Sequence, residues 1–153
     1  MQVIIRRARS SDAGPTADLF LRARRAGAAA GTIPPIAHDD DDVRHWVAGA
    51  MIPKLECWLA VSASDSIVGM LVLNDDWVAQ LYVDPDHTRA GIGAELLAVA
   101  KRERPDGLRL WTFVSNADAQ RFYLSHGFEE VQRTDGSGNE ERAPDIQYAW
   151  RPA

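Results

Sequence analysis

The chain contains the stretch Leu81-Tyr82-Val83-Asp84-Pro85-Asp86-His87-Thr88-Arg89-Ala90-Gly91-Ile92-Gly93-Ala94-Glu95-Leu96-Leu97, from which its fold can be inferred. Its first residues are apolar and β-prone, its middle is rich in turn residues, and its end has apolar residues at helical spacing. It therefore predicts a strand that passes through a tight turn into a helix. Residues 89–94 would place free backbone N–H groups at the positive end of that helix, and the glycines would let an anion approach closely.

This phosphate-binding interpretation has one structural alternative, and two known phosphate-binding motifs are absent. An isolated Gly-x-Gly also occurs in turns that need glycine for geometry alone. The dinucleotide fingerprint is absent because it needs a third glycine or alanine where Leu96 stands, and the Gly-Lys-Ser/Thr of the Walker loop is also absent. NAD and ATP are therefore disfavoured as ligands.

The chain before this stretch predicts a strand, two helices and an antiparallel meander. Residues 3–5 form the first strand, and the first helix begins at Ser10-Ser11-Asp12 and ends at Gly27 to Gly31, with Arg22, Arg24 and Arg25 on its solvent side. Two prolines make 32–37 a loop. The four aspartates of 39–42 open the second helix, which Pro53 closes. The expected meander strands are 57–63, 67–73 and 77–83.

The chain after it predicts one more strand–helix unit and two closing strands. The expected elements are a helix at 91–104, a strand at 108–114, a short helix at 116–126 that ends at Gly127, and strands at 129–133 and 146–150. A polar loop, 134–141, joins the last two strands. Because neither an internal repeat nor an interdomain linker is found, we expect one domain over residues 1–153.

Composition narrows the functional classes. The chain has 153 residues, 46% hydrophobic and 25% charged, with a formal charge of −5, which argues against a nucleic-acid partner. The single cysteine excludes an internal disulfide and any zinc site built from cysteines. Only Val3, Ile4 and Ile5 are consecutively apolar at the start, so we expect neither a signal sequence nor a membrane anchor, and a cytoplasmic location.

A second motif lies after the first, between residues 116 and 128. It comprises Asn116, Arg121-Phe122-Tyr123 and His126-Gly127-Phe128. Together with Leu81 to Pro85 and Arg89 to Ala94, it resembles the GCN5-related N-acetyltransferase (GNAT) family, over nearly the whole chain. The family loop is usually written Gln/Arg-x-x-Gly-x-Gly/Ala, and this chain has Thr88 in the first position, which questions a side-chain contact there more than coenzyme binding itself.

The resemblance implies a fold and a coenzyme site. The fold class is α/β (α+β), a single-domain GNAT-like fold with a mixed, largely antiparallel sheet flanked by about four helices. The co-substrate is acetyl-coenzyme A, with no metal. The coenzyme-binding positions that the resemblance implies are Leu81, Tyr82, Val83, Arg89, Ala90, Gly91, Ile92, Gly93, Ala94, Asn116 and Tyr123.

The resemblance also implies two catalytic roles. Tyr123 would protonate the departing thiolate, since a phenol with a pKa near 10 keeps its proton at neutral pH; the alternative is an aromatic that only packs between helix and sheet. Many relatives place a glutamate early in the fourth strand, but residues 77–80 contain no carboxylate. Asp76, with Asp75, is left as the candidate base, and turn formation is its alternative role. Gln80 could position a water but cannot act as a base.

The acceptor side is predicted from the loop between the first two helices. In the family this loop borders the acceptor, so Ile36 and His38 are substrate-binding candidates, together with Trp77 beside the coenzyme strand. His38 and the aspartates lack the spacing of a calcium loop, and capping explains those acids, so no metal is predicted. The aspartates would favour a cationic amine as acceptor.

The predicted function is direct transfer of an acetyl group to an amine of a small molecule or peptide. The main alternative is a non-catalytic acyl-CoA-binding sensor or partner-binding module with the same fold. A structural nucleotide-binding domain is a poor third, because both phosphate fingerprints fail. Since many relatives form dimers, a homodimer is one expectation. Polyamines, antibiotics, amino acids and protein N-termini remain open as acceptors.

Overall fold

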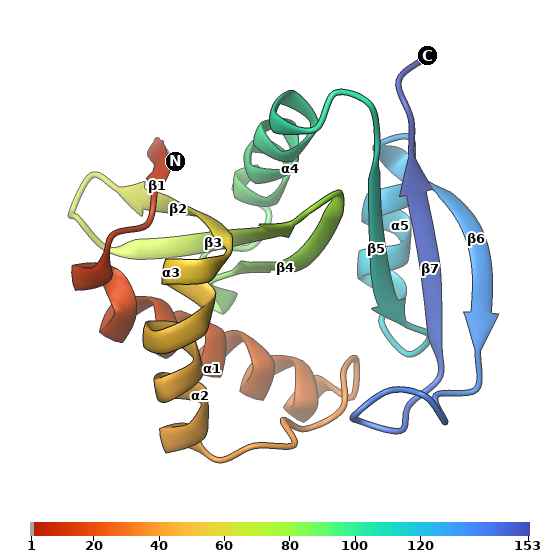
Figure 1. The fold of residues 1–153 in the computed structure, drawn as a ribbon, viewed down its shortest axis with the longest axis horizontal. Coiled ribbons are helices and arrows are strands. Elements are labelled where there is room, and N and C mark those ends of the chain that lie inside the picture. Colours follow the sequence, from red (N-terminus) through yellow and green to blue (C-terminus); the bar gives the residue numbers. More distant parts are fainter. Residues whose placement is uncertain (1) are drawn as a thin grey trace.

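The computed structural model describes residues 2–153 and contains one seven-stranded sheet. The strands are β1 (Val3–Arg7), β2 (Glu56–Ser62), β3 (Ile67–Asn74), β4 (Trp77–Val83), β5 (Leu108–Phe113), β6 (Glu129–Thr134) and β7 (Asp145–Trp150). Their order across the sheet is β1-β2-β3-β4-β5-β7-β6, and every neighbouring pair is antiparallel except β4 and β5. Figure 1 shows this arrangement, which confirms the mixed, largely antiparallel sheet.

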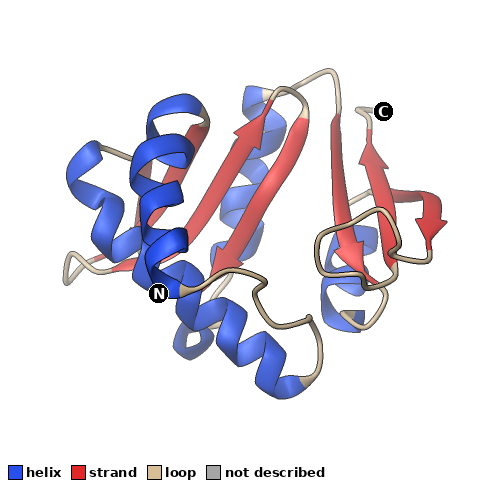
Figure 2. Ribbon diagram, turned by 60° about the horizontal axis from the view of Figure 1, so that its bottom comes forward, coloured by secondary structure: helices blue, strands red, loops and turns tan. Residues whose placement is uncertain are grey.

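Helices cover both faces of the sheet (Figure 2). They are α1 (Ala13–Ala30), α2 (Asp40–Trp46), α3 (Ile52–Lys54), α4 (Ile92–Glu103) and α5 (Ala117–Ser125). The expectation that Pro53 closes the second helix is wrong. A π-helical segment over Val47–Met51 joins α2 to α3, and Pro53 lies inside α3. A widened turn relieves the clash of a proline ring with the carbonyl four residues earlier, so the helix continues to Lys54.

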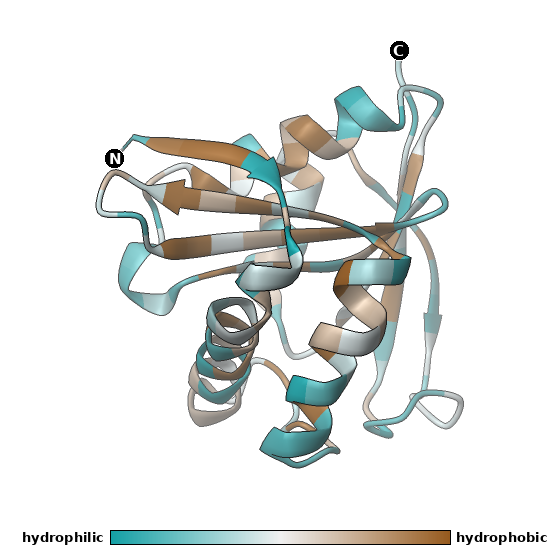
Figure 3. Cartoon of the chain, turned by 60° about the vertical axis from the view of Figure 1, so that its left-hand side comes forward, coloured by the Kyte–Doolittle hydropathy of each residue, from teal (hydrophilic) through white to brown (hydrophobic). Residues whose placement is uncertain are grey.

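Two apolar clusters, one on each face, hold the layers together. On one face α4 and α5 bury Leu96, Leu97 and Tyr123 against the sheet, and on the other α1 and α2 bury Leu19 and Val43. Figure 3 shows apolar residues concentrated along β1–β3, which these helices cover. Within residues 2–153, no helix combines the length and apolar character needed to cross a membrane.

The two parallel strands meet only at one end. Trp77 pairs with Arg109, and the Arg109 N–H donates to the Asp76 carbonyl at 2.9 Å, but no later residue of β4 pairs with β5. From that point the strands diverge, as Figures 1 and 2 show. Within residues 2–153, the β4 backbone beyond Trp77 is therefore paired to β3 on one edge and has no strand partner on the other.

A β-bulge changes which side chains of β4 face each layer. Val72 of β3 pairs with Gln80 and Leu73 pairs with Val78, so Ala79 is the extra residue. In a regular strand, side chains three residues apart point to opposite faces. Because of the bulge, Val78 and Leu81 nevertheless both pack on the α4 side. Tyr82 packs with the α1 and α2 cluster.

The end of α5 fixes the orientation of Tyr123. Gly127 has a φ of +88°, its N–H donates to the Leu124 carbonyl at 3.2 Å, and the Phe128 N–H donates to the Tyr123 carbonyl at 3.0 Å. This pair of bonds is the Schellman motif, and the rings of Tyr123 and Phe128 make its hydrophobic contact with centroids 5.4 Å apart. The predicted helix stop at Gly127 is thereby confirmed.

Candidate active site

The turn before α4 has the geometry of an anion cradle. Gly91 is the N-cap residue of α4 with a φ of +81°, and Arg89 also adopts a left-handed conformation, with a φ of +67°. Helical bonding begins with Glu95, whose N–H donates to the Gly91 carbonyl at 3.0 Å. The N–H groups of residues 92–94 therefore lack partners within the helix and lie at its positive end.

A continuous cleft runs from this turn to Tyr123. One cavity of about 570 Å³ lies at the turn, and a second of about 470 Å³ lies between β4, α1 and α5. The two cavities share lining residues, namely Val83, Thr88, Gly93, Asp118 and Phe122. The second cavity also reaches Leu81, Tyr82, Asn116 and Tyr123. The structure thus brings together the coenzyme-binding positions expected on β4 and α5 with those of the turn.

Gly93 stands where this cleft is narrow. A Cβ atom on Gly93 would lie 3.5 Å from the Phe122 ring and 3.8 Å from a Val83 methyl group. These are ordinary contact distances, so a single methyl group fits, but a larger side chain would occupy the space between the turn and Phe122. Glycine therefore keeps open the part of the cleft that an extended ligand must pass.

The side-chain amide of Asn116 uses its oxygen in a hydrogen bond within the protein and leaves its nitrogen available to a ligand. Its Oδ1 accepts from the Ala119 N–H at 3.2 Å and so caps α5. The Nδ2 group has no protein partner among residues 2–153 and belongs to a residue that lines the cleft. It is therefore free to donate to a ligand carbonyl.

Tyr123 is buried, with 8% of its surface exposed, yet it borders the cleft. Burial raises the pKa of its hydroxyl, and the nearby Tyr82 raises it further. The hydroxyl has no hydrogen-bond partner among the described residues. Tyr123 thus presents a protonated, unpaired hydroxyl next to the cleft.

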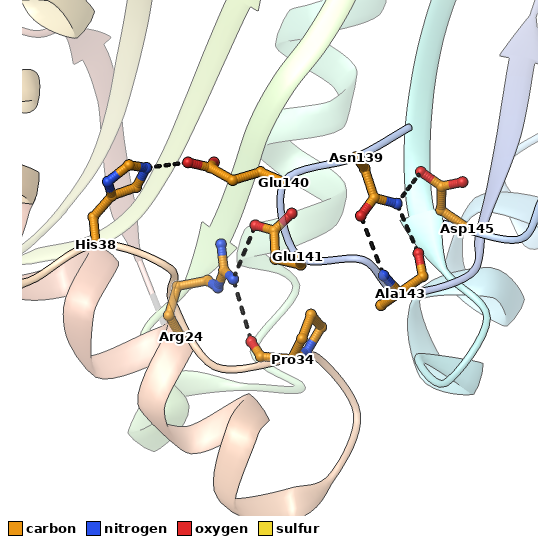
Figure 4. Close-up of polar contacts among 8 residues, drawn as sticks. All are labelled: Arg24, Pro34, His38, Asn139, Glu140, Glu141, Ala143 and Asp145. Carbon is orange, nitrogen blue, oxygen red and sulfur yellow. Dashed lines mark hydrogen bonds and ion pairs between the residues drawn. The ribbon is translucent and has the colours of Figure 1, made fainter. Parts of the chain in front are cut away.

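A third cavity, of about 400 Å³, lies next to this cleft, where α1, α2 and the loop between β6 and β7 meet at Gln80 of β4. It is lined by Phe20, Arg24, Ile36, Ala37, His38, Asp42, Val43, Trp46, Gln80, Glu140 and Glu141. Ile36 and His38, which the sequence analysis proposed as acceptor-binding residues, both line this cavity, and their role stays a prediction. Figure 4 shows His38 and Glu140 in contact across this cavity, from segments far apart in the chain. We refer to it as the acceptor cavity.

Sequence reasoning missed three charged residues of this cavity, Arg24, Glu140 and Glu141. Arg24 was expected on the solvent side of the first helix, but only 7% of its surface is exposed. Its Nη2 donates to the Pro34 carbonyl at 3.3 Å and lies 3.5 Å from a Glu141 oxygen (Figure 4). Glu140 and Glu141 stand in the loop between β6 and β7, where the only sequence signal was polarity. Their pairing with the α1 region is tertiary and has no local signature.

Two predicted residues lie away from the site. Asp76 precedes β4, and five residues of strand place it roughly 17 Å from Leu81. Arg109 donates two hydrogen bonds to its carboxylate, at 2.9 and 2.7 Å, and these bonds lower the pKa of Asp76. Trp77 stacks on Trp111, with centroids 6.4 Å apart, and lines none of the three cavities. We therefore do not retain Asp76 as the base or Trp77 as an acceptor residue.

The four aspartates have separate roles. Asp39 caps α2, because its Oδ1 accepts from the Asp42 N–H at 2.8 Å, and Asp40 pairs with Arg25. Of these acids, Asp42 alone lines the acceptor cavity. Within residues 2–153, no three His, Cys, Asp or Glu side chains gather in a way that could hold a metal ion.

Comparisons with known proteins identify the family. Residues 53–130, about half of the chain, match the acetyltransferase (GNAT) domain. The chain belongs to the GNAT family. This GNAT protein is 32% identical over 84 residues to the peptidyl-lysine N-acetyltransferase YjaB of Salmonella typhimurium, and 31% identical over 88 residues to YjaB of Escherichia coli K12. These matches cover 55% and 56% of this chain, and 57% and 58% of the relatives.

Solved structures share the fold. The GNAT protein superposes on apo-form YjaB from Escherichia coli with a TM-score of 0.78 at 24% identity, and the match covers all of both chains. It also superposes on the PaiA N-acetyltransferase of Thermoplasma acidophilum, solved in complex with coenzyme A, with a TM-score of 0.72 at 18% identity. That match covers 99% of this chain and 100% of the other.

Proposed function

We propose that this protein transfers an acetyl group from acetyl-coenzyme A to a primary amine. The observation that carries the proposal is the continuous cleft from the anion cradle to Tyr123, with the acceptor cavity next to it at Gln80 of β4. Such an arrangement lets two substrates meet along one strand. Membership of the GNAT family supports it, as do the names of the relatives.

The chain offers groups that suit each part of the coenzyme. The N–H groups of the turn, from Arg89 to Ala94, would hold the pyrophosphate. The free edge of β4 at Leu81, Tyr82 and Val83 would pair with the amides of the pantetheine arm, since β5 does not pair there. The Nδ2 of Asn116 would bind a pantetheine carbonyl.

When bound, acetyl-coenzyme A supplies the activated acetyl group as a thioester. A backbone N–H on the free edge of β4 would stabilise the negative charge that develops on the carbonyl oxygen. The Tyr123 hydroxyl would donate its proton to the departing sulfur. Burial disfavours both a phenolate and a free thiolate, so the pKa values of donor and acceptor rise together.

We infer direct transfer without an acyl-enzyme. The single cysteine, Cys57, is buried, and burial raises the pKa of its thiol to about 12. A thiol with that pKa is not ionised at neutral pH and cannot serve as the nucleophile.

The acceptor is proposed to be a cationic amine, in a peptide or a small molecule. Two curated relatives are named peptidyl-lysine N-acetyltransferases, and the acceptor cavity of this protein carries Asp42, Glu140 and Glu141. Gln80 lines the same cavity and would position a water for removal of the amine proton. This role replaces the one first expected of Asp76.

The alternative is an acyl-CoA sensor without turnover, and the absence of a carboxylate on β4 favours it. The two functions are separated by incubating the protein with acetyl-coenzyme A and a panel of amines, and measuring release of the coenzyme A thiol. Amine-dependent release supports the enzyme. Tight acetyl-coenzyme A binding with no release for any amine would support the sensor.

A further inference from the structure

We propose that Glu141 binds the ammonium group of the acceptor amine and that Arg24 is its positioning residue. The inference rests on the proposed function and assigns a specificity-determining carboxylate to its acceptor cavity. It is based on three observations: the cavities that Glu141 lines, the unsatisfied hydrogen-bonding capacity of Arg24, and the hydrogen bonds that hold the loop carrying Glu141.

Glu141 lines two cavities. It lines the acceptor cavity, and it also lines a cavity of about 600 Å³ against β5 and β7. Arg24, which Glu141 contacts, lines the acceptor cavity, and its chain neighbour Ala23 lines the coenzyme cleft. The Arg24–Glu141 pair therefore lies beside the part of α1 that borders both.

Arg24 is an incompletely satisfied buried cation. Its side chain is 8% exposed, and its Nε has no hydrogen-bond partner within residues 2–153. Its Nη2 lies 3.5 Å from Glu141, longer than the 2.7–2.9 Å of a strong charge-assisted bond. Glu141 is thus held in place without being saturated, and it keeps lone pairs for a second cation. The unpaired Nε indicates that a polar group of a bound acceptor completes this site.

The loop between β6 and β7 is braced so that it presents Glu141. The Asn139 Nδ2 donates to the Ala143 carbonyl at 2.7 Å and to Asp145 at 3.2 Å, and its Oδ1 accepts from the Ala143 N–H at 3.2 Å. Figure 4 shows these bonds beside the two glutamates, with Glu141 pointing toward Arg24 of α1 and Glu140 toward His38. Gly136 allows the tight packing, because a Cβ there would lie 2.3 Å from the Ala143 carbonyl carbon.

Glu141 suits a cation better than Glu140 does. The Glu141 side chain is 17% exposed, whereas Glu140 is 55% exposed and already pairs with His38. A less solvated carboxylate attracts a cation more strongly. Phe20 and Trp46, with ring centroids 5.8 Å apart, supply an apolar wall for the methylene stem of the amine. The chemistry fits a primary ammonium on an unbranched aliphatic stem, such as a lysine side chain.

The test compares acetylation of Nα-acetyl-lysine methylamide by the wild type, Glu141→Gln, Glu140→Gln and the control Glu130→Gln. Glu130 is matched because it also pairs with an arginine, Arg133, on the same hairpin but outside the three cavities. We expect Glu141→Gln to lower kcat/KM for this probe at least tenfold. The control should stay within twofold, and acetyl-coenzyme A affinity should be unchanged in all variants.

Arg24 is tested with Arg24→Lys and Arg24→Met. The lysine variant should retain much of the kcat/KM for the lysine probe, while the methionine variant should lose it through KM more than through kcat, with acetyl-coenzyme A affinity retained. Equal losses in both variants, or none, would contradict a positioning role.

Four outcomes separate the possible errors. If Glu141→Gln acetylates the probe with the same kcat/KM as the wild type, the assignment of Glu141 is refuted and the proposed function is not. A large loss in Glu140→Gln without one in Glu141→Gln moves the role to Glu140 and also refutes it. A wild type that binds acetyl-coenzyme A but acetylates no amine refutes the proposed function, and the assignment with it. Glu141→Asp, which keeps the charge, should fall between the wild type and Glu141→Gln; activity below that of Glu141→Gln would also count against the charge.

Discussion

At the scale of single residues, the Tyr123 hydroxyl is the group whose chemistry is easiest to isolate. Replacing Tyr123 by phenylalanine keeps the ring contacts with Phe122 and Phe128 and removes only the proton donor. We expect kcat to fall by about 10²-fold, with acetyl-coenzyme A affinity within threefold of wild type. Steady-state kinetics and calorimetry measure the two quantities. Tyr148→Phe is the matched control, because Tyr148 is 1% exposed and lies outside the cleft.

The kinetics of Tyr123→Phe can contradict this role directly. An unchanged kcat, with the chemical step shown to limit the rate by single-turnover measurements, would remove Tyr123 from the mechanism. A comparable fall in Tyr148→Phe would indicate that loss of a buried hydroxyl, rather than loss of a proton donor, lowers the rate.

The raised pKa of Tyr123 also predicts a pH profile. The hydroxyl must be protonated to act as an acid, and burial moves its pKa upward from 10, so its deprotonation should not lower the rate below pH 10. The acceptor amine must lose a proton before it attacks. We expect kcat/KM to rise with pH between 6 and 9 without a descending limb. A descending limb near pH 8 would require a different acid.

Sequence alone predicted the residues of the coenzyme cleft better than those of the acceptor cavity. Gly91, Gly93, Asn116 and Tyr123 lie in local motifs whose spacing carries the turn and helix geometry. Glu141 and Arg24 are 117 positions apart, so only the tertiary structure reveals that they meet. The roles of both sets remain predictions.

At the scale of elements, a carboxylate joins the first strand to the start of α1. Asp12 is 8% exposed and accepts from the Arg6 Nη atoms at 2.8 and 2.9 Å and from the Arg9 N–H at 2.7 Å. The hydrogen bonds from Arg6 are the largest cause of the lowered pKa of Asp12. We expect Asp12→Asn to lower the free energy of unfolding at pH 7 by about 1–3 kcal/mol, measured by urea titration.

The pH dependence of that loss has a definite sign. Because the pKa of Asp12 is lower in the folded state than in the unfolded state, its contribution is complete above the unfolded value of 3.8 and is lost as pH falls through the folded value. The difference between the wild type and Asp12→Asn should therefore shrink below about pH 4. A difference that stays constant down to pH 2 would show that the ionised carboxylate is not its source.

The end of β4 that pairs with β5, where Asp76 contacts Arg109, should be dispensable for catalysis. Asp76 and Arg109 are both about half exposed, so solvent screens their ion pair and it contributes little to stability. We expect Asp76→Asn to leave kcat within twofold and to lower Tm by a few degrees at most. A tenfold fall in kcat would restore Asp76 as a candidate base.

Most elements were predicted because their apolar residues repeat with the period of a helix or a strand. The exceptions are the π-helical segment at Val47–Met51 and the bulge at Ala79. The first accommodates Pro53 within a continuing helix, whereas a proline pattern by itself predicts a helix end. No residue type in β4 is specific for the bulge, so the sequence pattern could not indicate it.

At the scale of the whole molecule, three features meet at one cleft: the divergence of β4 from β5, the turn that precedes α4, and helix α5. The central claim is that acetyl-coenzyme A binds in this cleft. Gly93 lies in both cavities that form the cleft, so Gly93→Val should obstruct it without disturbing the core. Gly14→Val is the matched control, because a Cβ at Gly14 meets nothing within 4 Å and Gly14 borders no part of the cleft.

Calorimetric titration with acetyl-coenzyme A measures this claim most directly. The wild type and Gly14→Val should bind one equivalent with equal affinity, and Gly93→Val, shown to be folded by circular dichroism, should bind at least tenfold more weakly. A folded Gly93→Val that binds acetyl-coenzyme A as tightly as the wild type would contradict the placement of the coenzyme in this cleft, and a wild type that does not bind it at all would contradict the proposed function.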